Sequence, residues 1–104
     1  MKISVQREDF DLGREVKAMS DPRIGAVASF VGVVREVAMS LEHYPGMTEK
    51  ALHKIVDEAR SRWQVLDCTV IHRFGELEPT DQIVLVAVAS AHRGDAFAAC
   101  EFIM

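Results

Sequence analysis

The segment Ser90–Asp95, with the sequence SAHRGD, has the residue types best suited to chemistry. It follows an apolar strand pattern and precedes a helical one, so the free N–H groups of a helix start lie beside Arg93 and can bind an anion together with it. His92 titrates near neutrality and can donate or shuttle a proton. An equally good interpretation is an ordinary capped loop with a solvated histidine.

A second candidate is Arg35, which follows Gly32, Val33 and Val34 at the end of another apolar strand pattern. A guanidinium offers a fork of donors to phosphate or carboxylate, and a nearby glycine lets the backbone approach a ligand. Taken alone, an arginine that merely extends from a strand end into water is the favoured interpretation.

The stretch Leu41–Gly46, LEHYPG, is a third and weaker candidate. His43 and Tyr44 could stack on a flat heterocycle or hydrogen-bond to it, and a buried Glu42 could act as a general base. Packing around a turn is the simpler interpretation and the one we favour.

Other catalytic and metal-binding patterns are absent. His53 and His72 lack the spacing of metal ligands, so we expect both to be structural and expect no metal or cofactor. Cys68 and Cys100 are far apart in sequence, which indicates reduced thiols in the core. Neither a G-x-S-x-G motif nor a glycine-rich phosphate loop occurs.

Composition indicates one soluble globular domain over residues 1–104, because the chain is short and 49% hydrophobic with 27% charged residues. The net charge of −4 gives no general affinity for nucleic acid or anionic membranes. The longest apolar run, Ile83–Ala89, is too short to span a bilayer, and the beginning does not resemble a signal peptide. We therefore expect a cytoplasmic protein.

These candidates must be positioned by strands and helices, which the hydrophobic periodicity predicts. Gly32 predicts a bulge or a close backbone approach, and Thr48 predicts a helix N-cap. The order of elements favours an α+β fold with a largely antiparallel sheet. The predicted strands cover 2–6, 24–36, 37–44, 68–77 and 82–90, and the predicted helices lie between Asp9 and Asp21, from Thr48 to Trp63, and from Gly94 onward.

Four stretches together closely resemble the large, catalytic subunit family of molybdopterin synthase. They are FVGVVR, LEHYPGMTEKAL, VIHRFGELEPTDQIVLVAVASAHR and AFAACEFIM, and the resemblance runs from about Ile24 to Met104.

The resemblance implies an α/β hammerhead fold with flanking helices and a sulfurtransferase activity. The family converts cyclic pyranopterin monophosphate, or precursor Z, into molybdopterin for molybdenum cofactor biosynthesis. Sulfur arrives as a thiocarboxylate on the C-terminus of a small ubiquitin-like subunit. The resemblance further implies a homodimer of large subunits within a heterotetramer.

The family's functional residues carry over to positions in this chain. Val33, Val34 and Arg35 match a substrate-binding strand end, and His92 and Arg93 match a His-Arg pair with substrate-binding and catalytic roles. Both segments coincide with the anion candidates chosen from the residues alone. For Glu42–Met47, which is also a family signature, we expect packing that shapes the pocket.

The chain departs from the family pattern in two places. The family has two lysines, one regarded as catalytic, in a segment beyond the position of Met104, and it has a longer glycine-containing loop where Arg35 is followed almost at once by Val37. Each difference has two explanations, a true deletion or residues missing from the printed chain, and the uncapped helix end favours the second. If both deletions are real, the alternative is a noncatalytic dimeric module that binds the ubiquitin-like partner.

Overall fold

The computed structural model describes residues 1–104 and contains six strands and three helices. The strands are β1 (Lys2–Gln6), β2 (Ala26–Val33), β3 (Met39–Leu41), β4 (Asp67–Arg73), β5 (Gly75–Leu77) and β6 (Gln82–Ser90). The helices are α1 (Leu12–Lys17), α2 (Met47–Arg62) and α3 (Arg93–Ile103). No helix has the length and apolar character needed to cross a bilayer.

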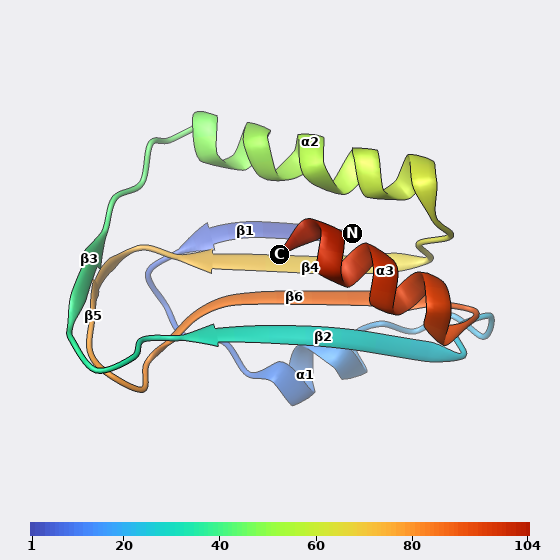
Figure 1. The fold of residues 1–104 in the computed structure, drawn as a ribbon, viewed down its shortest axis with the longest axis horizontal. Coiled ribbons are helices and arrows are strands. Elements are labelled where there is room, and N and C mark those ends of the chain that lie inside the picture. The colour runs from blue at the N-terminus through green and yellow to red at the C-terminus, as the bar shows by residue number, and fades with distance from the viewer.

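A four-stranded sheet in the order β1-β4-β6-β2 forms the centre of the fold, and β3 and β5 pair in a separate small sheet at one end of it (Figure 1). The pairs β4–β6 and β6–β2 are antiparallel, and β1 joins β4 in parallel. The predicted α+β class with a largely antiparallel sheet is therefore confirmed. β2 lies at one edge, where its outer backbone groups have no strand partner.

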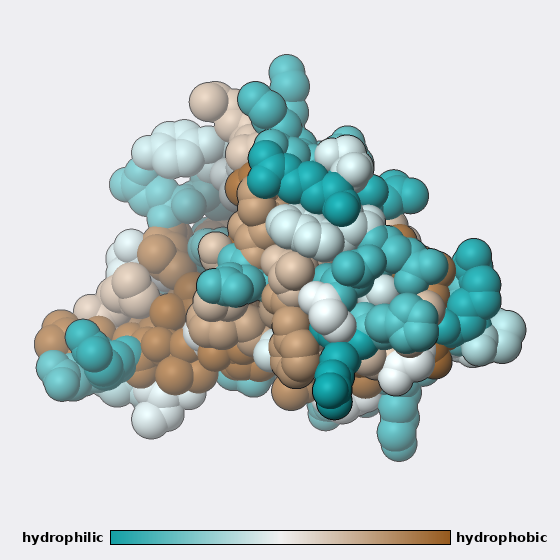
Figure 2. Space-filling model, turned by 45° about the vertical axis from the view of Figure 1, so that its right-hand side comes forward, coloured by the Kyte–Doolittle hydropathy of each residue, from teal (hydrophilic) through white to brown (hydrophobic).

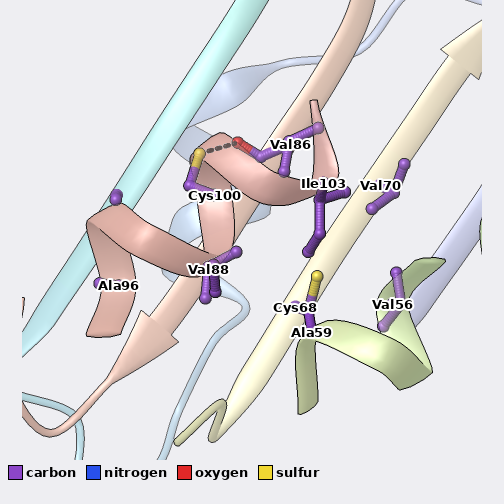
Figure 3. Close-up of a cluster of buried hydrophobic side chains, with 11 residues drawn as sticks. Val56, Ala59, Cys68, Val70, Val86, Val88, Ala96, Cys100 and Ile103 are labelled. Carbon is purple, nitrogen blue, oxygen red and sulfur yellow. Dashed lines mark hydrogen bonds between the residues drawn. The ribbon is translucent and has the colours of Figure 1, made fainter. Parts of the chain in front are cut away.

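The main core lies between one face of this sheet and the helices α2 and α3 (Figure 3). α3 packs over β6 and β2, whereas α2 packs against α3 and β1. The strands contribute alternate residues to this face, as expected for a pleated sheet covered by helices. The buried residues include Val70, Val86, Val88, Ala99 and Ile103.

The opposite face of the sheet carries a smaller cluster formed by Phe10, Ile71, Leu85 and Ala87. Leu12 of α1 and neighbouring apolar residues pack against it. Because both faces are covered, β4 and β6 are apolar in consecutive positions rather than alternating ones, which is why their sequences are continuous apolar runs.

Both cysteines are free and buried in the main core, as predicted. The Cys100 thiol donates to the Val86 carbonyl oxygen at 3.7 Å. Burial raises the pKa of the Cys68 thiol to about 12, with smaller contributions from the nearby Asp67 charge. Thiols held in this form are poor nucleophiles, so neither cysteine is placed for sulfur chemistry.

The predicted strand over 68–77 is wrong in one respect, because it divides into β4 and β5. Gly75 has a φ of 95°, which turns the chain out of the main sheet after Phe74. A Cβ at Gly75 would also lie 2.8 Å from the Arg7 guanidinium. The structure therefore has one strand more than the predicted order of elements. β4 belongs to the four-stranded sheet, and β5 belongs to the two-stranded sheet.

Two further boundaries differ from the sequence prediction. The strand expected over 37–44 covers only 39–41, and the prediction of Thr48 as N-cap is wrong because α2 begins at Met47 with Gly46 as its N-cap. Gly46 has a φ of 83°, and its N–H donates to Glu49 Oε2 at 3.4 Å. The Pro-Gly turn and the acidic residue thus start the helix two positions earlier than a threonine cap would.

Candidate functional site

Arg35 follows β2 on a short, firmly held piece of backbone. The Val34 N–H donates to the Asp81 carbonyl at 2.9 Å, and the Val34 carbonyl accepts from the Thr80 N–H at 2.9 Å. Val34 is buried and anchors this strand end, while Val33 and Arg35 are exposed on either side of it. The Arg35 guanidinium has no ion pair or hydrogen bond within the chain, so it is free to bind an anion.

The predicted irregularity at Gly32 is confirmed, since the β2–β6 register shifts between Gly32 and Val33. A Cβ at Gly32 would lie 2.9 Å from Val84 Cγ1 of the neighbouring strand. The bulge re-aims the residues that follow it, which sets the direction of the strand end that carries Arg35.

The chain is continuous and tight directly after Arg35. The Val37 N–H donates to the Arg35 carbonyl at 2.7 Å, and Glu36 between them has a φ of 66°. The turn between β2 and β3 is therefore short. The expectation that residues are missing from this loop stays a prediction.

His92 and Arg93 lie where β6 ends and α3 begins. Both are exposed, and neither side chain has an ion pair or hydrogen bond within the chain. His92 is the N-cap residue of α3, yet its side chain makes no capping bond. The imidazole and the guanidinium are thus available beside the N-terminus of an 11-residue helix, an arrangement that favours anions.

These two candidate segments lie at opposite ends of the sheet in a single chain. Ala26 pairs with Ser90, next to His92, whereas Val33 pairs with Gln82 at the other end of the same strands. β2 has 8 residues, so its ends are roughly 25 Å apart. Figure 1 shows the same separation, with the arrowhead of β2 at the left and the start of α3 at the right. One subunit therefore does not bring Arg35 and Arg93 into one pocket.

The LEHYPG stretch lines an open groove of about 810 Å³ between the small sheet and the end of β1. The His43 ring lies 4.6 Å from the Phe74 ring, and the Arg7 guanidinium lies 4.7 Å from the same ring. His43 Nε2 is 3.0 Å from Glu49 Oε1. This stack joins β1, the β4–β5 turn and the start of α2, so His43 has a packing role, as favoured from the sequence.

Glu42 in this groove and Glu49 next to it are already engaged, by Tyr44 and His43 respectively. The hydrogen bond from His43 holds the pKa of Glu49 below its ordinary value. Tyr44 donates its hydroxyl to Glu42, and that bond raises the pKa of the tyrosine. Since Glu42 accepts from Tyr44 at an exposed position, it is not the buried general base considered above.

No group of three or more histidine, cysteine, aspartate or glutamate residues is placed to hold a metal ion. His72 Nδ1 lies 2.8 Å from the Arg73 carbonyl, and Arg73 itself bonds the carbonyls of Arg7 and Gln82. The pair His72-Arg73 thus ties three strands together and does not face a ligand.

Sequence reasoning missed the residues that support the candidate segments. Gly25 donates its N–H to the Ser90 carbonyl at 3.0 Å, and a Cβ there would lie 2.2 Å from the Ala91 carbonyl oxygen. Gln64 holds the same junction from the other side. No local pattern signals either contact, because each joins segments far apart in the chain.

Comparison with known proteins gives a consistent result. The family described as "MoaE protein" matches residues 5–104, which extends the resemblance beyond its expected start near Ile24. A molybdopterin synthase catalytic subunit from Ralstonia nicotianae is 63% identical over 98% of this chain and 63% of its own length. This chain therefore spans less than two thirds of that relative.

Solved structures agree with the sequence comparison. A MoaE protein from Burkholderia ambifaria has a TM-score of 0.95 and 58% identity, covering 100% of this chain and 74% of that one. A complex of subunits 1 and 2 of the molybdopterin-converting factor from Helicobacter pylori has a TM-score of 0.77 over 95% of this chain and 72% of that one. At 19% identity this second likeness shows the fold alone.

One relative has a longer alignment than this chain has residues. The alignment with a relative from Cereibacter sphaeroides covers 100% of this chain and runs over 111 positions, although the chain has 104 residues. That relative therefore has internal residues that this chain lacks. On the match over residues 5–104 and the 63% identity, the chain belongs to the MoaE family.

Proposed function

We propose that the protein is the catalytic subunit of a molybdopterin synthase. It transfers sulfur from the thiocarboxylated C-terminus of a small ubiquitin-like subunit to precursor Z, which forms the molybdopterin dithiolene. The observation that carries the proposal is the 63% identity with a molybdopterin synthase catalytic subunit over 98% of this chain. The free cationic side chains at both strand ends fit this chemistry, because the substrate phosphate and the thiocarboxylate are both anions.

Each candidate residue has a role suited to its chemistry. Arg35 and Arg93 bind and neutralise anionic oxygen or sulfur through guanidinium donors. His92 donates a proton to the oxygen that sulfur displaces, a role for which an exposed and unpaired imidazole is suited. The exposed Val33 and the backbone anchored at Val34 form the apolar edge beside Arg35.

A second copy of the chain brings the separated segments together in this proposal. If the open edges of two β2 strands face each other antiparallel, the end of one β2 lies beside the beginning of the other. Ala26 at that beginning pairs with Ser90 in its own chain. Arg35 of one copy would therefore lie beside His92 and Arg93 of its partner, and two equivalent sites would form.

The surface around β2 supports such a homodimer. Figure 2 shows apolar side chains gathered in the lower part of the view, at the height of β2 and β6 in Figure 1, below the hydrophilic surface of α2. A patch of this kind commonly marks an interface. The exposed apolar residues of β2 and α3 are Val27, Phe30, Val33 and Phe97, with Met104 after them.

The small subunit is the second partner in this proposal. The relatives are named catalytic subunits, which implies a further subunit, and the same fold occurs in the Helicobacter pylori complex of two subunits. The predicted cytoplasmic location, the single domain over 1–104 and the lysines in a segment beyond Met104 remain predictions.

The direct test is to mix the purified protein with the thiocarboxylated small subunit and precursor Z and to measure molybdopterin. Product formation is expected, and loss of the thiocarboxylate should accompany it. Binding of the small subunit without any product would instead favour the noncatalytic binding module. Absence of both binding and product would contradict the proposed partner as well.

The shared site has its own test, in which Arg35→Ala and Arg93→Ala chains are mixed and allowed to exchange subunits. Each variant alone should be nearly inactive. A mixed dimer has one site with both arginines and one with neither, so random exchange should restore about a quarter of the parental activity. No restoration, with exchange verified by mass spectrometry of differently tagged chains, would contradict a site shared between subunits.

A further inference from the structure

The backbone just before His92 is held by a side chain from a different part of the fold. Gln64 lies in the connection between α2 and β4, and its Oε1 accepts from the Ala91 N–H at 3.1 Å and from the Ser90 hydroxyl at 3.2 Å. Ser90 is fully buried, and this amide oxygen is the only partner of its hydroxyl. A buried hydroxyl without a partner is unfavourable, so the contact fixes the position of Gln64 as well.

Gln64 also holds the other side of the junction. Its backbone N–H donates to Asp95 Oδ2 at 3.0 Å, and Asp95 belongs to the first turn of α3. The same residue therefore bonds the chain before His92 and after Arg93. On the far side, the Gly25 N–H donates to the Ser90 carbonyl at 3.0 Å, so the end of β6 is held from two directions.

The side chains of His92 and Arg93 have no such restraint, because neither has a hydrogen bond or ion pair within the chain. Their direction is therefore set by the backbone that carries them. A small displacement of catalytic groups can reduce a rate severely even when the fold is intact. Through its bonds, Gln64 in the connection after α2 can therefore determine where His92 and Arg93 are placed.

We propose that Gln64 is a positioning residue for His92 and Arg93. The inference rests on the proposed function, in which these two residues contact substrate or the sulfur-bearing tail. Gln64 itself contacts neither. It acts through the Ser90–Ala91 backbone and through Asp95, which together fix the direction in which the pair leaves the β6–α3 junction.

The test compares the sulfur-transfer rate of Gln64→Ala and Gln64→Glu with that of the parent protein. Alanine removes the acceptor, and the rate should fall about 10-fold. Glutamate has a side chain of the same length and keeps an acceptor oxygen. The sulfur-transfer rate of Gln64→Glu at physiological salt should therefore stay within about 2-fold of the parental rate. The matched control is Gln6→Ala, which removes a side chain that bonds Ser4 and Glu8 in β1 and its following loop and should not change the rate.

A double-mutant comparison separates positioning from a general structural effect. If Gln64 acts through the His-Arg pair, Gln64→Ala should slow transfer little further once Arg93 is already alanine. Full additivity of the two losses would overturn the proposal. So would a folded Gln64→Ala protein that transfers sulfur at the parental rate.

Amide hydrogen exchange gives a readout that does not require activity. The Ala91 amide should lose protection in Gln64→Ala and keep it in Gln64→Glu, while amides in the centre of β6 remain protected in both. Unchanged protection of Ala91 in the alanine variant would overturn the positioning role. If the parent protein forms no molybdopterin, it is the proposed function that fails, and exchange still shows whether Gln64 holds the junction.

Discussion

At the scale of single residues, the candidate site consists of exposed cations on fixed backbone. Arg35, His92 and Arg93 have no partners in the chain, whereas His43 and Glu42 of the LEHYPG stretch are bonded to Glu49 and Tyr44 respectively. An unpartnered cation costs little at the surface and is available for a ligand. This difference distinguishes the two motifs by chemistry: one is open to ligands, and the other joins elements.

Replacing Arg93 by alanine should reduce the sulfur-transfer rate by about 100-fold, because a donor aimed at developing negative charge is lost. The free energy of unfolding should change by less than about 1 kcal/mol, since the side chain is exposed and unpaired. A single-turnover assay and urea denaturation measure the two quantities. Arg60→Ala is the matched control, an exposed and unpaired arginine on α2 that should affect neither. Loss of folding in Arg93→Ala would assign Arg93 to structure.

The sequence could reveal these residues but not their arrangement. His92 and Arg93 stand out because polar residues abruptly follow an apolar strand, and Arg35 stands out for the same reason. Their separation follows from the antiparallel pairing of β2 with β6, which places the end of one strand beside the beginning of the other. Local pattern contains no information on that pairing, so the sequence alone could not show that the two segments lie at opposite ends of the sheet.

At the scale of elements, β2 and β6 are the pair that positions both candidate segments. Their register places Gly25 against the Ser90–Ala91 backbone at one end and the Asp81 turn against Val34 at the other. Close backbone contact at both ends explains why the strand termini are well defined although the side chains beyond them are free.

Substituting Gly25 by alanine should destabilise the fold by about 1–3 kcal/mol, because the new Cβ would lie 2.2 Å from the Ala91 carbonyl oxygen and the backbone would have to move. Gly94→Ala is the matched substitution, since nothing lies within 4 Å of its Cβ position and alanine is the better helix former. Thermal denaturation of both variants measures the difference. Equal stability of the two would show that the Gly25 contact is easily relieved.

The elements themselves were largely predictable, and the errors have identifiable causes. β1 and α2 follow clear periodicity, β6 is a continuous apolar run, and Gly32 correctly indicated a bulge. The break at Phe74–Gly75 was missed because the apolar and β-branched pattern continues through it, while the Arg7 side chain that lies close to Gly75 comes from a distant part of the chain. Strand patterns indicate pairing potential, but they do not reveal to which sheet a strand belongs.

At the scale of the whole molecule, acid should destabilise the fold through three exposed or nearly exposed carboxylates. Arg23 lowers the pKa of Asp21 to about 2, a hydrogen bond from Gln82 lowers that of Asp9, and His43 lowers that of Glu49. A lowered folded-state pKa means that the unfolded chain takes up protons first as the pH falls. Stability is therefore fully present above about pH 4.5 and should decline from there toward pH 2.

Thermal denaturation between pH 6 and pH 2 checks this expectation. Asp21→Asn should make the dependence on pH less steep, because one of the three proton-linked groups is removed. Arg14→Gln serves as the control, since Arg14 lies elsewhere on the surface and makes no side-chain ion pair. A variant without Asp21 that retains the full acid sensitivity of the parent would contradict the role assigned to the Asp21–Arg23 pair.

The parallel pairing of β1 with β4 has a consequence for synthesis on the ribosome. Lys2 pairs with Thr69 and Gln6 with Arg73, so the first strand to be made has no partner until two thirds of the chain has followed. At ordinary translation speeds this interval is roughly 3–13 s. During that time the nascent N-terminus must stay free of competing strands, and the sheet is completed only when β6, the last strand to be made, pairs with both β4 and β2.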